Sequence, residues 1–185
     1  MATKTETDVR TAKDGRQYLL RAARPNDARP LARLFSDVRA EGRYLVTPPG
    51  ARSESHEAYF IRELIGGGES LILVAEAGAA VVGNVMVLPE QSRVQDHVGT
   101  LSICVAMDWR DAGIGSALVD RALRWAIGRG LRKVQLSVFP DNARAIAVYE
   151  HAGFTTECIR RMQFRTPDGE YRDELLMAWF PVGSG

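Results

Sequence analysis

Two glycines stand one residue apart at the start of a helical pattern in the segment RDAGIGSALVDRALRWA, residues 110–126. Gly113 and Gly115 leave the backbone open to close approach, because glycine has no side chain and accepts dihedral angles that other residues resist. The first turn of a helix also carries unpaired N–H groups and the positive end of the helix dipole. The segment therefore predicts a binding site for an anion.

Two common nucleotide-binding motifs do not match this segment. A dinucleotide fingerprint needs a third glycine or an alanine where the chain has Leu118, and a P-loop needs Gly-Lys-Ser/Thr, whereas Ser116 follows Gly115. The remaining pattern, Arg110-x-x-Gly113-x-Gly115 after an expected strand, predicts a pyrophosphate cradle made of backbone N–H groups.

A second group of chemically useful residues lies in NARAIAVYEHAGF, residues 142–154. Asn142 and Tyr149 are separated by two helical turns and therefore lie on one helix face. An amide can hold a ligand by hydrogen bonds, and a phenol can donate a proton to a leaving group.

The rest of the chain predicts one mixed α/β domain that positions these two segments. Apolar runs and alternating patterns favour strands, and 3.6-residue periodicity favours helices. The expected strands are 18–23, 71–76, 80–87, 97–107, 133–138, 154–165 and 171–180, and the expected helices are 24–42, 55–68, 113–128 and 142–154.

The segments ICVAMDWRDAGIGSAL and NARAIAVYEHAGF, in this order, resemble the acetyl-CoA motif and the Asn…Tyr…Gly-Phe motif of the GNAT superfamily of N-acetyltransferases. LRAARPNDARPL resembles the superfamily's opening strand and helix, and DELLMAWF resembles its closing strand. The resemblance covers roughly residues 18–180 and agrees with one domain over residues 17–181. The polar composition of residues 1–16 predicts a disordered leader, and residues 182–185 are expected to be a short tail. The implied fold is a mixed, mostly antiparallel sheet of six or seven strands, with a V-shaped splay between two central parallel strands and about four flanking helices.

The same resemblance implies acetyl-CoA as cosubstrate and no metal. The pantetheine arm would pair with the strand before the glycines, the pyrophosphate would lie on the N–H groups of the glycine loop, and Tyr149 would serve as the catalytic proton donor to the thiolate. The residues implied in cofactor binding are Ile103, Cys104, Val105, Arg110, Asp111, Ala112, Gly113, Ile114, Gly115, Ser116, Asn142 and Tyr149.

The residue that accepts the proton of the amine is left open. Many members of the superfamily carry a carboxylate where this chain has Thr100, whose hydroxyl is not a base at neutral pH. Asp96, His97 and Glu41 are the alternatives, and Glu41, Tyr44 and His97 are the candidates for contact with the acceptor.

Composition excludes several classes of partner. With 24 basic and 23 acidic residues, the chain has a net charge of +1, which does not favour nucleic acid or an anionic membrane. The two cysteines provide no disulfide framework, and we expect a cytoplasmic protein. Superfamily members are often dimers. A net charge of +1 provides little electrostatic repulsion between two copies of the chain, so we expect a homodimer.

Two classes of function follow. The first is an acetyl-CoA-dependent N-acetyltransferase in which a primary amine attacks directly in a ternary complex. Its acceptor would be a small molecule such as an amino acid or an amino-acid-like antibiotic, as in phosphinothricin-type enzymes, or alternatively a peptide or protein N-terminus. The second is a non-catalytic acyl-CoA-binding or sensor domain. Asn142 and Tyr149 favour the enzyme, and Thr100 favours the sensor.

Overall fold

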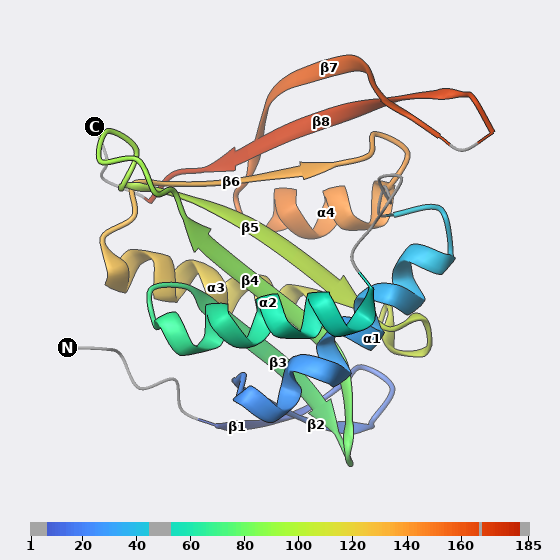
Figure 1. Cartoon of the computed structure of the whole chain (residues 1–185), viewed down its shortest axis with the longest axis vertical. Helices are drawn as coiled ribbons and strands as arrows, with labels where there is room; N and C mark the ends of the chain where they lie inside the picture. Colours follow the sequence, from blue (N-terminus) through green and yellow to red (C-terminus); the bar gives the residue numbers. More distant parts are fainter. Residues whose placement is uncertain (1–6, 45–52, 167, 182–185) are drawn as a thin grey trace.

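The computed structural model describes residues 7–44, 53–166 and 168–181. Within these residues eight strands form one sheet in the order β1-β2-β3-β4-β5-β6-β8-β7 (Figure 1). The strands are β1 (Asp8–Thr11), β2 (Gln17–Ala22), β3 (Leu71–Ala77), β4 (Ala80–Pro89), β5 (Val98–Val105), β6 (Lys133–Val138), β7 (Thr155–Arg165) and β8 (Tyr171–Trp179). The α-helices are α1 (Ala28–Ala40), α2 (Glu54–Gly67), α3 (Ile114–Arg129) and α4 (Ala143–His151), and the 3₁₀ turns are η1 (Pro25–Asp27) and η2 (Met107–Trp109).

This topology confirms the predicted fold class. Neighbouring strands are antiparallel except for the central β5–β6 pair, which is parallel. The described sheet has eight strands instead of six or seven, because the predicted leader contains β1, which pairs with β2 from Asp8 opposite Leu20 to Thr11 opposite Gln17. The prediction of a disordered leader is therefore wrong for residues 8–16. Residues 1–6 and 182–185 lie outside the described residues.

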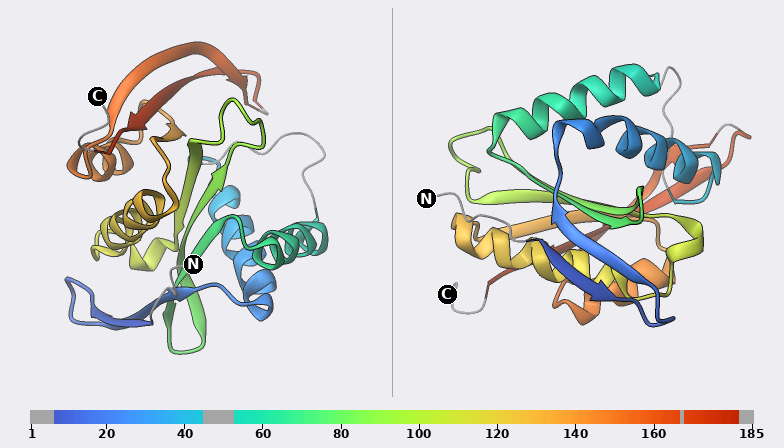
Figure 2. Two further views of the ribbon diagram at one scale, coloured as in Figure 1. Left: turned by 90° about the vertical axis from the view of Figure 1, so that its left-hand side faces the viewer. Right: turned by 90° about the horizontal axis from the view of Figure 1, so that it is seen from below.

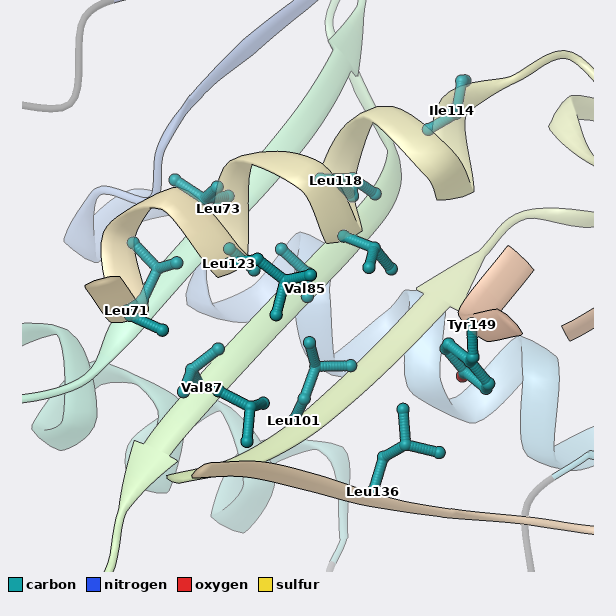
Figure 3. Close-up of a cluster of buried hydrophobic side chains, with 14 of the residues drawn as sticks. Leu71, Leu73, Val85, Val87, Leu101, Ile114, Leu118, Leu123, Leu136 and Tyr149 are labelled. Atoms are coloured by element: carbon teal, nitrogen blue, oxygen red, sulfur yellow. The ribbon is translucent and has the colours of Figure 1, made fainter. Parts of the chain in front are cut away.

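The helices cover the two faces of the sheet in pairs (Figure 2). Helices α1 and α2 pack on one face, and α3 and α4 pack on the other. Each face has its own buried cluster, and the larger cluster lies beneath α3 (Figure 3). In the described part of the chain, no helix is long and apolar enough to cross a membrane.

Helix α3 is positioned by one apolar face that repeats every three or four residues. Ile114, Leu118, Ala122 and Ala126 on this face are fully buried, and the helix packs across β3, β4 and β5. This packing fixes the N-terminus of α3 against the end of β5. The glycine loop between β5 and α3 is therefore held by two buried elements.

Candidate active site

The parallel strands β5 and β6 separate after a short paired segment. Val98 pairs with Lys133 and the last pair is Thr100 with Gln135, so that Leu101–Val105 continues without β6 as a neighbour. The opposite edge of β6 pairs with β8 from Val134 to Val138. Figure 1 shows the two strands meeting at one end and diverging towards the other. This is the predicted V-shaped splay.

The register shows which backbone groups of β5 face the splay. Glu90 donates its N–H to Val98 O and Ala106 donates its N–H to Val82 O, both at 2.9 Å. Because hydrogen-bonded and non-hydrogen-bonded pairs alternate in an antiparallel ladder, the even-numbered residues of β5 bond to β4. The odd-numbered residues, including Ile103, direct their backbone groups to the open edge.

Cys104 and Val105 were both predicted to bind the cofactor at this edge, but some of their backbone groups are already hydrogen-bonded within the protein. Cys104 is an even-numbered residue opposite Asn84, so its backbone bonds to β4 and not to the splay. The carbonyl of Val105 faces the splay but accepts a hydrogen bond from Arg110 Nε at 3.0 Å. The amide group of Ile103 and the N–H of Val105 remain for a ligand.

The loop between β5 and α3, called the cradle below, presents a row of backbone N–H donors where the sequence predicts an anion site. Asp111 and Gly113 have φ angles of 62° and 86°, which turn successive N–H groups to the same side. Within the described residues, no protein acceptor is paired with the backbone N–H groups of Asp111, Ala112, Gly113, Ile114, Gly115 and Ser116. The cradle combines these donors with the positive end of the α3 dipole.

The two glycines of the cradle have different reasons to be glycine. Gly113 caps α3 in the left-handed region, where a Cβ is strained. Gly115 has an ordinary φ, and a Cβ built there meets no atom within 4 Å. No protein atom fills the space above Gly115, so a ligand can approach the backbone closely there.

Arg110 does not add a donor to the cradle. Its backbone N–H bonds to Met107 O at 3.2 Å. Its guanidinium bonds both oxygens of Glu41, at 2.7 and 2.5 Å, and lies 4.9 Å from the centre of the Tyr44 ring. Arg110 therefore joins the end of α1 to the open end of the splay, and it brings Glu41 and Tyr44 there.

Asn142 and Tyr149 begin and nearly end α4, as the spacing predicts. Asn142 is the N-cap of the helix, and its Oδ1 accepts a hydrogen bond from Ala145 N at 3.3 Å. Tyr149 is 5% exposed and its ring packs against Phe154. Figure 3 shows Tyr149 beside the arrowhead of β5 and above Leu136 of β6. Burial raises the pKa of the Tyr149 phenol, which therefore stays protonated at neutral pH.

The thiol of Cys104 is not a nucleophile in this site. Its side chain belongs to the cluster beneath α1 and α2, and burial raises its pKa to about 12. A thiol with so high a pKa forms almost no thiolate at neutral pH. This favours direct attack by the amine over an acyl-cysteine intermediate.

Glu90, which follows β4, was not among the residues predicted from the sequence. Thr100 donates its hydroxyl to Glu90 Oε1 at 3.0 Å, and Gln135 Nε2 lies 3.5 Å from the same oxygen and 3.2 Å from Thr100 Oγ1. Since Thr100 and Gln135 form the last pair before the splay, this carboxylate lies at its closed end. Antiparallel pairing of the expected strands 80–87 and 97–107 brings Glu90 close to Thr100 only in the observed register, in which Leu88 lies opposite Thr100.

His97 and Asp96 precede β5 at its opposite end from the cradle. The His97 side chain is half exposed, with Nδ1 3.9 Å from Asp96 Oδ1, and its carbonyl accepts hydrogen bonds from Arg132 and Lys133. The structure therefore does not bring His97 together with Glu41 and Tyr44. In the described part of the chain, no three side chains of His, Cys, Asp or Glu are grouped so that they could hold a metal ion.

Comparison with known proteins agrees with this geometry. The model of the acetyltransferase (GNAT) family matches residues 35–154. The L-amino acid N-acetyltransferase of Escherichia coli is 35% identical over 108 residues, which are 57% of this chain and 65% of that protein. The ribosomal protein bS18-alanine N-acetyltransferase of Escherichia coli is 36% identical over 85 residues, which are 46% of this chain and 57% of that protein. A phosphinothricin acetyltransferase of the GNAT superfamily from Sinorhizobium meliloti, solved in complex with acetyl-CoA, has a TM-score of 0.79 at 21% identity and covers 88% of both chains.

The chain belongs to the GNAT acetyltransferase family, since the family model spans more than half of its length. The regions matched in the two Escherichia coli relatives cover less than two thirds of those proteins. The phosphinothricin acetyltransferase shares the fold.

Proposed function

We propose that this chain is an acetyl-CoA-dependent N-acetyltransferase that acts on a primary amine. The observation that carries the proposal is the row of free N–H groups from Asp111 to Ser116, with open space above Gly115, beside an unpaired edge of β5. Such a row suits a pyrophosphate, and such an edge suits the amide groups of a pantetheine arm. Asn142, at the start of α4, is the candidate to hold that arm near its thioester.

Acetyl-CoA, when bound, supplies an activated acetyl group and a thiolate leaving group. The ammonium form of the amine must lose one proton before it attacks and a second proton after the C–N bond has formed, whereas the departing thiolate gains one proton, so one proton per turnover is released to solvent. A primary amine has a pKa of ~8 to 10, so a proton acceptor raises the fraction that attacks. Tyr149 is the proton donor in this scheme, because its buried hydroxyl remains protonated. The N–H groups on the open edge of β5 are donors for the developing oxyanion.

Glu90 is the proton acceptor in this scheme. Its Oε1 receives hydrogen bonds only from the neutral groups of Thr100 and Gln135, within the described residues, and it is half-buried at the closed end of the splay. Glu41 is the other carboxylate beside the splay, but both of its oxygens are bonded to Arg110. Protonating Glu41 would break its ion pair with Arg110, whereas Glu90 has no cationic partner among the described residues.

The acceptor is a small amine in this proposal, as the name of the L-amino acid N-acetyltransferase suggests. The name of the bS18-alanine N-acetyltransferase makes a protein N-terminus the alternative acceptor. A panel of amino acids, polyamines and short peptides, assayed for thiol release from acetyl-CoA, tests both. We expect release to depend on an amine of the small-molecule class. Release with peptides alone would select the alternative, and no release with any amine, despite CoA binding, would select a sensor domain.

Glu90→Gln should lower turnover by ~10- to 100-fold at neutral pH, because the glutamine keeps the hydrogen bonds but cannot accept a proton. The loss should shrink as pH rises, since the amine then loses its proton to solvent. A pH–rate profile of both enzymes measures this effect. Asp96→Asn, which removes an exposed carboxylate before β5, is the matched control and should keep the full rate. A parallel drop of both profiles at every pH would contradict the role of Glu90.

The chain should form a homodimer in solution, and the edge strand β7 supports this. Every residue of β7 except Phe164 is exposed, and the side chains of Ile159 and Met162 are 55% and 63% exposed. Edge strands offer unpaired backbone groups to a second copy. Light scattering at tens of micromolar should therefore give the mass of a dimer, and Ile159→Arg should shift it to a monomer. A wild-type monomer at that concentration would exclude the dimer.

A further inference from the structure

The turn between β1 and β2, residues 12–16, lies against the loop that leads into α3. Gly15 donates its N–H to Ala12 O at 2.9 Å, and Ala12 donates its N–H to Arg16 O at 2.8 Å. The first of these bonds closes a β-turn, and the φ of 87° at Gly15 is one that glycine adopts without strain. The segment KDGR therefore folds locally into a compact turn, called the β1–β2 turn below.

One contact of the β1–β2 turn fixes a peptide group of the cradle. Lys13 donates its backbone N–H to Ala112 O at 3.0 Å. The carbonyl of Ala112 and the N–H of Gly113 belong to one trans peptide group, so they point in opposite directions. Because the turn holds this carbonyl, the N–H of Gly113 is directed away from the turn, and it has no acceptor among the described residues. The contact therefore sets the direction of one donor of the cradle.

A second contact holds the beginning of the same loop. Arg16 donates from its guanidinium to Asp108 O at 2.7 Å, and the guanidinium lies 3.7 Å from the centre of the Trp109 ring. Asp14 accepts a hydrogen bond from Arg16 Nε at 2.8 Å, which orients the arginine from within the turn. A cation over the face of an aromatic ring is an attractive contact. The β1–β2 turn thus holds residues 108–112 at both ends.

We propose that the β1–β2 turn is a positioning element of the cradle, and that Lys13, through its backbone N–H, and Arg16 are its two positioning residues. The proposal rests on the proposed function, in which the cradle receives a pyrophosphate. Asp111 has a φ of 62°, which is strained for a residue with a side chain, so the loop needs contacts that hold its shape. Contacts that order a loop before its ligand arrives raise the affinity, because less ordering is left to the binding step.

Lys13→Pro tests the first contact, because proline has no N–H and suits the second position of a β-turn. Lys13→Ala is the matched control, since it also lacks the lysine side chain but keeps the N–H. In calorimetry, Lys13→Pro should bind CoA about tenfold more weakly than Lys13→Ala, the usual effect of one hydrogen bond. The KM for acetyl-CoA should rise by the same factor while kcat changes by less than about twofold, and both variants should melt like the wild type.

Arg16→Ala tests the second contact and should weaken CoA binding by ~3- to 10-fold. Arg33→Ala removes an exposed arginine of α1, on the other face of the sheet, and should bind CoA like the wild type. Equal CoA affinities of Lys13→Pro and Lys13→Ala would overturn the proposal. A fall in melting temperature that accompanies every loss of affinity would show that the turn supports only the fold, and would overturn it as well.

These measurements separate the positioning role from the proposed function. If CoA binding differs among the variants as expected but no amine is acetylated, the positioning role stands and the enzymatic proposal fails. If amines are acetylated but the variants bind CoA alike, the enzymatic proposal stands and the positioning role fails. If the wild type does not bind CoA, both fail.

Discussion

Replacing Tyr149 by phenylalanine should lower turnover by ~10²-fold or more, the usual effect of losing a general acid. The change removes the hydroxyl but keeps the ring that packs against Phe154. The Michaelis constant for acetyl-CoA should change little, because the lost interaction matters in the transition state. Steady-state thiol release at saturating amine measures both constants.

Tyr59→Phe is the matched control for this variant. Tyr59 lies on α2 with 63% of its surface exposed, and its hydroxyl has no part in the proposed chemistry. The control should turn over at the wild-type rate. If Tyr149→Phe also keeps the full rate, the phenol only packs, and the thiolate leaves unassisted or takes its proton from water.

Gly115→Glu should weaken CoA binding by more than ~10²-fold, because a side chain and a negative charge would occupy the space of the pyrophosphate and disrupt at least two charge-assisted hydrogen bonds. The fold should survive, since a Cβ at this position meets no protein atom within 4 Å. Calorimetry with CoA gives the affinity, and a thermal melt confirms the folded state.

Gly66→Glu on α2 provides the matched control for this loss of binding. Gly66 is also a helical glycine with an ordinary φ, and a Cβ there also meets nothing within 4 Å. The control should bind CoA like the wild type. A folded Gly115→Glu variant with unchanged affinity would show that the pyrophosphate lies elsewhere.

Local sequence patterns could predict the elements that position the site. The 3.6-residue repeat from Ile114 to Ala126 predicts α3, and the two helical turns between Asn142 and Tyr149 predict that both lie on one face of α4. These signals are local, because each depends on residues close together in the chain. The parallel β5–β6 pair and its splay were implied by the resemblance to the GNAT superfamily and not by any local pattern.

Contacts between distant segments could not be read from the sequence in the same way. Arg110 pairs with Glu41, which is 69 positions away. Because of this ion pair, the guanidinium of Arg110, which was predicted to bind the cofactor, is bonded to the residue that follows α1. Glu90 reaches Thr100 only through the register of β4 on β5. The polar residues 8–16 gave no hydrophobic signal for a strand, yet their hairpin contacts the cradle through Lys13.

The transfer of an isotope-labelled acetyl group from acetyl-CoA to an amine tests the central claim most directly. The purified chain is mixed with labelled acetyl-CoA and an equimolar panel of amines, and mass spectrometry identifies the labelled product. We predict a labelled N-acetyl amine that forms with the wild type and is strongly reduced with both Tyr149→Phe and Gly115→Glu. A wild-type chain that binds acetyl-CoA but leaves every amine unlabelled would contradict the account.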